Sequence, residues 1–270
     1  MSAQSPKYFY ATESWDESAW LDIVSVEYES LVSAYPFDTK LRAISKEGQL
    51  RILDVGCGSA IFPQYLNGIL GDGIQLTCDL LDVSERSLKQ AHAVLEELEH
   101  FSPGMNIPSL IEDIPDTLPL SGPHYEAIWA IHSLTTVDVD QMRSVFRHLL
   151  DLLADDGQLF IYQLTADSSY QTLHQIYREC TSEGVPPFME FEDTERILKS
   201  LPVEYDVLEL SFDHELPRNQ PDLVEHYLRK CVLDESVDTQ QVFSDLLPRF
   251  ESDGLYRIPQ SVNFISVSKR

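Results

Sequence analysis

The segment Ile52-Leu53-Asp54-Val55-Gly56-Cys57-Gly58-Ser59-Ala60 constrains the fold of this 270-residue chain more than any other feature. Its start has the apolar character of a buried strand, and two glycines follow within three positions. Glycine lets the backbone turn tightly and approach a ligand closely, and the helix expected over 62–70 offers free N–H groups at its start. A third glycine is absent, and Ala60 stands near its place. The turn alone is a weak indication of a nucleotide-like ligand.

Apolar runs and amphipathic helices alternate after this turn. The helices are expected over 84–99 and along a stripe from Met142 to Leu153, where Gly157 is expected to provide a left-handed cap. Such alternation predicts βαβ units, and therefore an α/β fold with a parallel sheet covered by helices on both faces. The expected strands cover residues 51–55, 74–81, 107–111, 125–131 and 159–164.

The two ends of the chain depart from this alternation. Residues 6–47 predict helices rich in aromatic side chains, which either close over the ligand as a lid or simply pack on the sheet. Near the C-terminus, strands expected over 203–212 and 262–267 are separated by helical stretches. We therefore expect an N-terminal helical cap (1–47), a core (48–212 and 261–270) and a helical substrate-side insertion (213–260).

The second strand ends in a carboxylate, Asp82, 26 residues after Gly56. An acidic residue at this place binds ribose hydroxyls in dinucleotide-binding folds, usually about 20 residues after the glycine turn. Asp79 on the same strand is the alternative. Asp82 also has a structural interpretation as a helix N-cap, although Ser84 is better placed for that role. Two ligand classes remain, the dinucleotides and S-adenosylmethionine.

The charge of the chain excludes several partner classes. Nineteen basic and 45 acidic residues give a formal net charge of −26. Such a field repels nucleic-acid backbones and anionic membrane surfaces, so we expect neither as a partner. No run reaches the ~18 apolar residues of a membrane span, and no signal peptide is recognisable, so a cytoplasmic location is expected. The four cysteines have no CxxC spacing, which predicts reduced thiols and no metal site.

The motif Leu53-Asp54-Val55-Gly56-Cys57-Gly58 resembles the first motif of class I S-adenosylmethionine-dependent methyltransferases. The resemblance covers about residues 48–165 and the C-terminal strands. It implies a Rossmann-like, seven-stranded, mostly parallel sheet with an antiparallel last strand. It further implies that S-adenosylmethionine is the cofactor and that the substrate is a small molecule. We expect the protein to be a monomer or a weak homo-oligomer. The implied cofactor contacts are Asp54, Gly56, Gly58, Asp82, Ile131 and either Glu112 or Asp113.

His132 follows the strand over 125–131 and therefore lies at the carboxyl end of the sheet, where ligands of open parallel sheets bind. A lone histidine in this position is either a structural residue or a catalytic one. If it is catalytic, it orients or deprotonates the acceptor atom.

A second resemblance is to the histamine N-methyltransferase family, on residues 128–134, the helix with Tyr170 and His174, and the segment 260–265. That family carries an amide at the position of His132 and another near Gln260. It also carries a glutamate in its N-terminal helical segment, which corresponds to either Glu27 or Glu29 and is implied to anchor a cationic group. Its aromatic pair after strand four is Thr135-Thr136 here, so the resemblance implies a different substrate. The implied substrate contacts are Tyr28, Tyr170, His174 and Gln260.

These observations favour methyl transfer to a nitrogen of an amine or imidazole-type small molecule. An alkyl amine with a pKa of about 10.4 is mostly protonated at pH 7, whereas an imidazole nitrogen has a free lone pair. The alternatives are an O- or C-methyltransferase of a secondary metabolite and a non-catalytic cofactor-binding partner subunit. A dinucleotide-dependent dehydrogenase is disfavoured by the antiparallel strand pair at the C-terminus.

Overall fold

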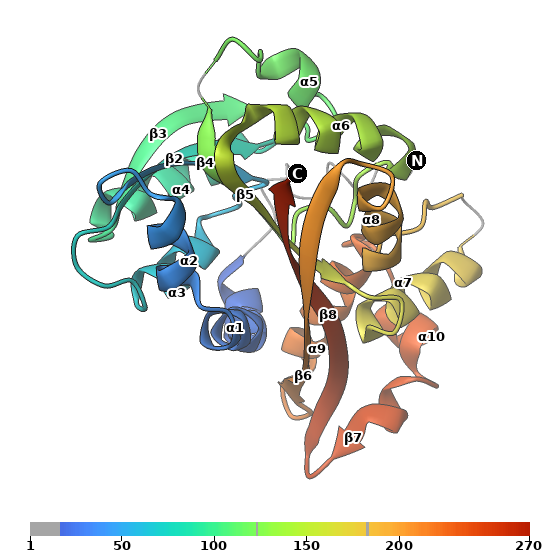
Figure 1. Cartoon of the computed structure of the whole chain (residues 1–270). Coiled ribbons are helices and arrows are strands. Elements are labelled where there is room, and N and C mark those ends of the chain that lie inside the picture. The colour runs from blue at the N-terminus through green and yellow to red at the C-terminus, as the bar shows by residue number, and fades with distance from the viewer. Residues whose placement is uncertain (1–16, 123, 182–183) are drawn as a thin grey trace.

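The computed structural model describes residues 17–122, 124–181 and 184–270. Its centre is one sheet with the strand order β3-β2-β1-β4-β5-β8-β6, and the short β7 pairs with β8 (Figure 1). β1 to β5 are parallel, and β8 runs antiparallel between β5 and β6. The expected mostly parallel sheet with an antiparallel last strand is confirmed. The strands are β1 (Gln49–Val55), β2 (Gln75–Asp82), β3 (Phe101–Pro108), β4 (Tyr125–Ile131), β5 (Leu153–Leu164), β6 (Val203–Pro217), β7 (Glu251–Ser252) and β8 (Leu255–Lys269).

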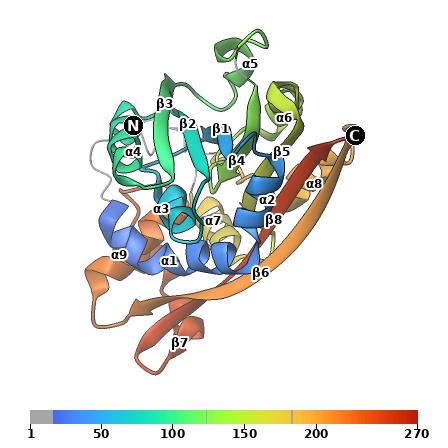
Figure 2. The ribbon, with the colours of Figure 1, turned by 60° about the vertical axis from the view of Figure 1, so that its left-hand side comes forward.

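Helices cover both faces of the sheet, and each face has its own apolar core (Figures 1 and 2). One core contains side chains of α1 (Glu17–Ala34), α2 (Phe37–Ile44), α3 (Ile61–Asn67), α4 (Glu85–Glu97), α7 (Ser169–Cys180), α9 (Pro221–Val232) and α10 (Thr239–Phe243). The other contains side chains of α5 (Ile114–Thr117), α6 (Val139–Leu152) and α8 (Phe191–Leu198). No described helix has the length and apolar character needed to cross a membrane.

β4 is apolar at every position after Glu126 because this part of the strand is buried on both faces. Ala127 and Trp129 point into the first core, and Ile128 and Ala130 into the second. Because successive strand residues face opposite sides, a strand between two helical layers needs apolar side chains at every position. The sequence prediction for this strand, 125–131, agrees with the observed bounds.

Two local predictions are wrong. The third strand lies at 101–108 and not at 107–111, because it is an edge strand whose Pro103 and Gly104 weaken its strand pattern. The helix α6 does not end at a left-handed Gly157. It ends at Leu152, and β5 begins at Leu153, with a register shift against β4 that absorbs the Asp155-Asp156-Gly157 segment.

The last two long strands form a hairpin of 15 residues on each side, longer than the sequence predicts. Val203 pairs with Lys269 at one end and Pro217 with Leu255 at the other. Figure 2 shows that the distal half of this hairpin extends beyond the parallel strands and passes α1 and α9. The connection between the strands holds α9, α10, a 3-10 helix (Leu247–Phe250) and β7. The hairpin therefore brings β6 into contact with α1 and α9.

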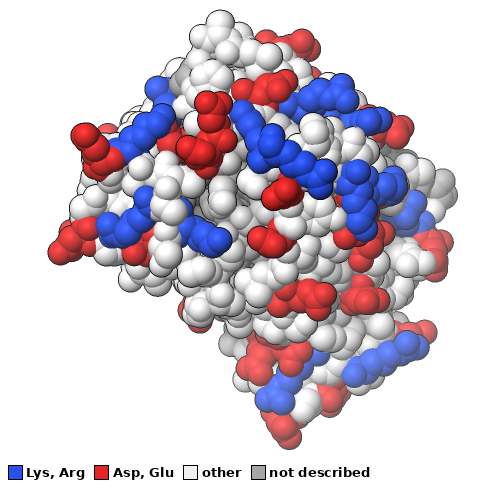
Figure 3. Space-filling view, in the orientation of Figure 1, with Lys and Arg blue, Asp and Glu red and all other residues white. Residues whose placement is uncertain are grey.

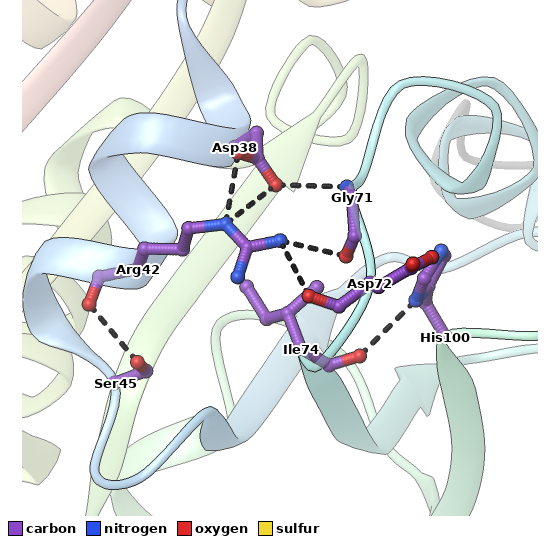
Figure 4. Close-up of polar contacts among 7 residues, drawn as sticks. All are labelled: Asp38, Arg42, Ser45, Gly71, Asp72, Ile74 and His100. Carbon is purple, nitrogen blue, oxygen red and sulfur yellow. Dashed lines mark hydrogen bonds and ion pairs between the residues drawn. The ribbon is translucent and has the colours of Figure 1, made fainter.

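A polar latch fixes α2 to the loop before β2 (Figure 4). The Arg42 guanidinium donates to both carboxylate oxygens of Asp38 and, at 2.6 Å, to the carbonyl oxygen of Gly71. Asp38 also accepts a hydrogen bond from the Gly71 amide. The bond from Arg42 is the main cause that lowers the pKa of Asp38. The latch anchors the N-terminal helical segment, and with it α1, to the sheet. Four aromatic residues of the expected N-terminal helical segment lie outside the described residues, namely Tyr8, Phe9, Tyr10 and Trp15.

Candidate active site

A cavity of about 600 Å³ opens at the carboxyl ends of β1, β2 and β4. The strand order reverses between β1 and β4, because the chain proceeds from β1 to β2 and β3 on one side and from β4 to β5 on the other. Ligands of open α/β sheets bind at this reversal. The volume is within the range of about 300–1,000 Å³ that is typical of small-molecule sites. α1 contributes Glu27 and Tyr28 to the lining, so the N-terminal segment forms one wall.

The glycine turn is held in place by the second strand. The amides of Gly56 and Cys57 donate to the Leu81 carbonyl oxygen, and the Gly58 amide donates to Asp82 Oδ2 at 3.0 Å. Gly56 has φ +70°, and a Cβ there would lie 2.4 Å from Ser133 Cβ. The turn therefore needs glycine both for its left-handed backbone and for its close approach to the end of β4.

Ala60 is the N-cap of α3 and has a left-handed backbone with φ +60°. The side chain is fully buried. The departure from the three-glycine motif therefore concerns the backbone as well as packing, since a left-handed conformation favours glycine by about 1 kcal/mol or more.

Asp82 is the carboxylate at the end of β2 and lines the cavity. Its Oδ1 accepts a hydrogen bond from the Ser84 amide, and Ser84 itself caps α4 by accepting from Ser87. The structure thus assigns the N-cap to Ser84. Asp79, the alternative on this strand, is fully buried and accepts hydrogen bonds from Arg51 and the Tyr125 hydroxyl, and it does not line the cavity.

Asp54 lies beneath the glycine turn and reaches the cavity although it is only 4% exposed. Burial raises the pKa of Asp54 to about 7, and the negative charge of Asp82 contributes to the rise. Among the described residues no cationic side chain pairs with Asp54, and a buried carboxyl without such a partner favours its neutral form. A cationic ligand group at this end of the cavity would reverse that preference.

His132 follows β4 and lies against the buried Glu27 of α1, with its Nε2 atom in close contact with Glu27 Oε2. The backbone of His132 has φ +59°, a strained conformation for a non-glycine residue and one that is common at functional sites. Burial raises the pKa of Glu27, but two imidazoles, those of His132 and His214, outweigh it and lower this pKa to about 2. His132 and Glu27 therefore form an imidazole–carboxylate pair at the cavity wall.

The remaining predicted site residues divide into two groups. Those that line the cavity are Gly56, Gly58, Glu112, Ile131, Tyr28 and Tyr170. Those that do not are Glu29, Asp113, His174 and Gln260. Glu29 and Asp113 are exposed, whereas His174 is buried and stacks on Phe188. Burial lowers the pKa of His174 to about 3, so its imidazole is neutral.

The sequence interpretation missed His214, Phe188 and Lys230. His214 is on β6 and contacts Glu27, whereas Phe188 and Lys230 line the cavity. Phe188 and Lys230 stand in segments without a strand-end or glycine signal, so nothing in the sequence marks them. His214 lies just beyond the predicted strand, and only the observed length of the hairpin brings it to α1.

Comparisons with known proteins identify the family. A model described as a methyltransferase domain matches residues 28–201, which is more than half of the chain. The chain belongs to the methyltransferase domain family. The matched range begins at Tyr28 and includes the glycine turn, Asp82 and His132, so it covers most of the cavity wall. No match is found among curated proteins.

Solved structures share the methyltransferase fold. The YcgJ protein from Bacillus subtilis is similar with a TM-score of 0.56 at 13% identity, over 86% of this chain and 97% of that one. The plantazolicin methyltransferase BpumL, solved in complex with SAH, has a TM-score of 0.53 at 14% identity, over 98% and 95%. The mitomycin 7-O-methyltransferase MmcR has a TM-score of 0.55 at 12% identity, over 100% and 62%. The predicted likeness to histamine N-methyltransferases receives no support from these matches.

Proposed function

We propose that this methyltransferase transfers a methyl group from S-adenosylmethionine to a nitrogen of a small molecule. The observation that carries the proposal is the His132–Glu27 pair, which lines the same cavity as the glycine turn and Asp82. The pair supplies a proton acceptor in the cavity that Gly56, Gly58 and Asp82 also line. The names of the neighbours BpumL and MmcR accord with a small-molecule acceptor.

The residues present fit the cofactor. Gly56 and Gly58 line the cavity and let the backbone approach a ligand closely, and Asp82 offers a carboxylate to ribose hydroxyls. Asp54 is a buried carboxyl that a ligand ammonium group would help to ionise. Glu112 lines the cavity and is the better placed of the two predicted adenine contacts. When bound, S-adenosylmethionine supplies a methyl group that is already activated by its sulfonium.

The chain then has two tasks, which are to align the acceptor and to remove its proton. Alignment is a matter of position in a walled cavity. Proton removal falls to His132, since Glu27 holds its Nε2 atom and leaves Nδ1 for the acceptor. The negative charge of Glu27 stabilises the imidazolium that forms. His132 is thus the proposed catalytic residue. Glu27 positions its imidazole and stabilises the protonated form.

The acceptor nitrogen is one with a lone pair at neutral pH. Deprotonating an alkyl ammonium of pKa about 10.4 at pH 7 costs roughly 4–5 kcal/mol at about 1.36 kcal/mol per unit. An imidazole or aromatic amine avoids this cost. A hydroxyl acceptor is the second candidate, because a histidine–carboxylate pair is also the arrangement that removes a hydroxyl proton during attack.

The test is labelled-methyl transfer to a panel of imidazoles, aromatic amines, alkyl amines, phenols and carboxylic acids. We expect transfer to the nitrogen nucleophiles. Transfer confined to phenols would replace the nitrogen proposal by the hydroxyl one, and SAH binding without transfer to any acceptor would favour a non-catalytic cofactor-binding subunit. His132→Ala should lower kcat by about 10²–10⁴-fold and leave the Kd of SAH unchanged.

Glu29→Gln is the matched control for Glu27→Gln, because both glutamates are on α1 and Glu29 is exposed outside the cavity. Glu27→Gln should lower kcat, and Glu29→Gln should not. Equal kcat values for both variants would remove Glu27 from the mechanism.

A further inference from the structure

A chain of buried polar side chains leads from Glu27 away from the cavity. Glu27 Oε1 lies 2.6 Å from Nε2 of His214, and Nδ1 of His214 lies 2.9 Å from the Tyr227 hydroxyl. The Gln260 amide donates to the same hydroxyl at 3.2 Å. All four residues are at most 2% exposed, and they come from α1, β6, α9 and β8. The long hairpin and its insertion thus meet the N-terminal helix at one point.

The donors and acceptors along this chain can be ordered in one direction. Gln260 Oε1 accepts hydrogen bonds from the Ser168 hydroxyl at 2.5 Å and from the Tyr170 amide, so its NH₂ group faces Tyr227. The Tyr227 oxygen therefore accepts from Gln260. Its proton has two neighbouring acceptors, the Cys231 sulfur and Nδ1 of His214, and the imidazole nitrogen is the stronger acceptor because a thiol sulfur accepts only weakly. A neutral imidazole that accepts at Nδ1 carries its proton at Nε2, which is the atom against Glu27.

The direction of the chain fixes the state of His132. Ionised Glu27 only accepts hydrogen bonds, and its two oxygens each contact one imidazole Nε2. His214 occupies Oε1, so the carboxylate is held with Oε2 toward His132. His132 then keeps its proton at Nε2 and presents the lone pair of Nδ1.

We propose that His214 is a positioning residue for methyl transfer: with Tyr227 behind it, it holds Glu27 so that His132 faces the acceptor as the Nε2–H tautomer. The proposal rests on the proposed function, in which His132 removes the acceptor proton. It adds a buried second imidazole that touches neither substrate nor cofactor. A hydrogen-bond partner at one ring nitrogen of a functional histidine orients the ring and sets its tautomer, and a residue that holds this partner in place acts in the same way.

The neighbouring titratable groups leave this state undisturbed. Burial raises the pKa of Tyr162 well above its ordinary value, and the charge of Glu27 adds to the rise. Burial likewise raises the pKa of Tyr227 and of the Cys231 thiol beside it. These three groups therefore stay neutral near pH 7. The two imidazoles are therefore the groups that contact the two carboxylate oxygens of Glu27 among the described residues.

The tautomers can be read by NMR from the full-length protein labelled with ¹⁵N-histidine and saturated with SAH. His132→Asn and His214→Gln assign the two signals, and the exposed His124 is the internal control. We expect both His132 and His214 as Nε2–H tautomers. A wild-type spectrum with His132 protonated at Nδ1 alone would overturn the proposal without any variant.

Three variants test the positioning role. In the spectrum of His214→Phe, His132 should no longer be present as the Nε2–H tautomer alone, and the signals of His124 should be unchanged. The same variant should have a kcat about tenfold lower with little change in KM. His214→Gln keeps a donor toward Glu27 and should recover most of kcat. In a His132→Ala background, His214→Phe should cost no further activity, because its effect passes through His132.

The outcomes separate the two proposals. An unchanged His132 spectrum in His214→Phe, or additive losses in the double variant, contradicts positioning by His214. The NMR spectrum is recorded without a methyl acceptor, so it is independent of the acceptor panel. If no acceptor is methylated but both histidines are Nε2–H tautomers, the proposed function is refuted and the hydrogen-bonded chain from Gln260 to His132 is supported. If His214→Phe does not fold, Tyr227→Phe takes its place: loss of one oxygen should move the His214 signals, and unchanged signals contradict the proposed direction.

Discussion

Asp54→Asn should make the cofactor-free protein more stable at alkaline pH. The pKa of Asp54 is about 7 in the folded protein because of burial, against 3.8 as its ordinary value. Between these two values the unfolded chain has released the proton and the folded chain has kept it, so stability falls as pH rises. At about 1.36 kcal/mol per pH unit the total loss of folding free energy is slightly more than about 4 kcal/mol, and about 3 kcal/mol of it accrues between pH 5 and pH 8.

The assay is urea unfolding of wild type and Asp54→Asn at pH 5 and pH 8, followed by tryptophan fluorescence. The difference between the two proteins should grow by about 3 kcal/mol in favour of asparagine, since the amide does not titrate. Asp116→Asn, at an exposed site, controls for the change from carboxylate to amide. A difference that is equal at both pH values would refute the argument that Asp54 is buried without a cationic partner.

Three further variants test the turn and the core. Gly56→Ala should weaken SAH binding at least tenfold in calorimetry. Adding Ser133→Gly to this variant should restore part of the affinity, because it removes Ser133 Cβ, which lies 2.4 Å from the new Cβ. No recovery of affinity would show that backbone strain alone is responsible. Ala60→Gly should raise the free energy of unfolding by about 1 kcal/mol in urea titrations by relieving its left-handed backbone, and a loss would indicate that the buried methyl matters more. Asp79→Ala should lower the free energy of unfolding by about 3 kcal/mol, because it leaves buried donors without their acceptor, and a loss below 1 kcal/mol would contradict this.

Parallel strands and the glycine turn were predictable because their signals are local. β4 is apolar at consecutive positions from Ala127 onward since both its faces are covered, and the turn after β1 carries two glycines within three positions directly after an apolar run. The edge strand β3 could not be placed, because one neighbour and an exposed side impose little pattern on it. The end of α6 was misplaced since pairing with β4 overrode the preference of Gly157 for a helix cap.

The candidate site shows the same division. His132 and Asp82 were predicted because each stands at a strand end, which the topology brings to one edge. The choice between Glu27 and Glu29 needed the rotation of α1 against the sheet, which only the structure gives. His214 belongs to a strand whose partner lies about 45 residues further along the chain, at Ile258, and its contact with α1 depends on the reach of that hairpin.

Calorimetric titration with SAH tests most directly whether this cavity is a cofactor site. We predict saturable binding at one site per chain, no heat with NAD, and an affinity at least tenfold lower for Asp82→Asn, since a hydrogen bond to a charged group contributes roughly 1.5–3 kcal/mol. Absence of binding by wild type at millimolar SAH, or equal affinity in the Asp82 variant, would contradict the account.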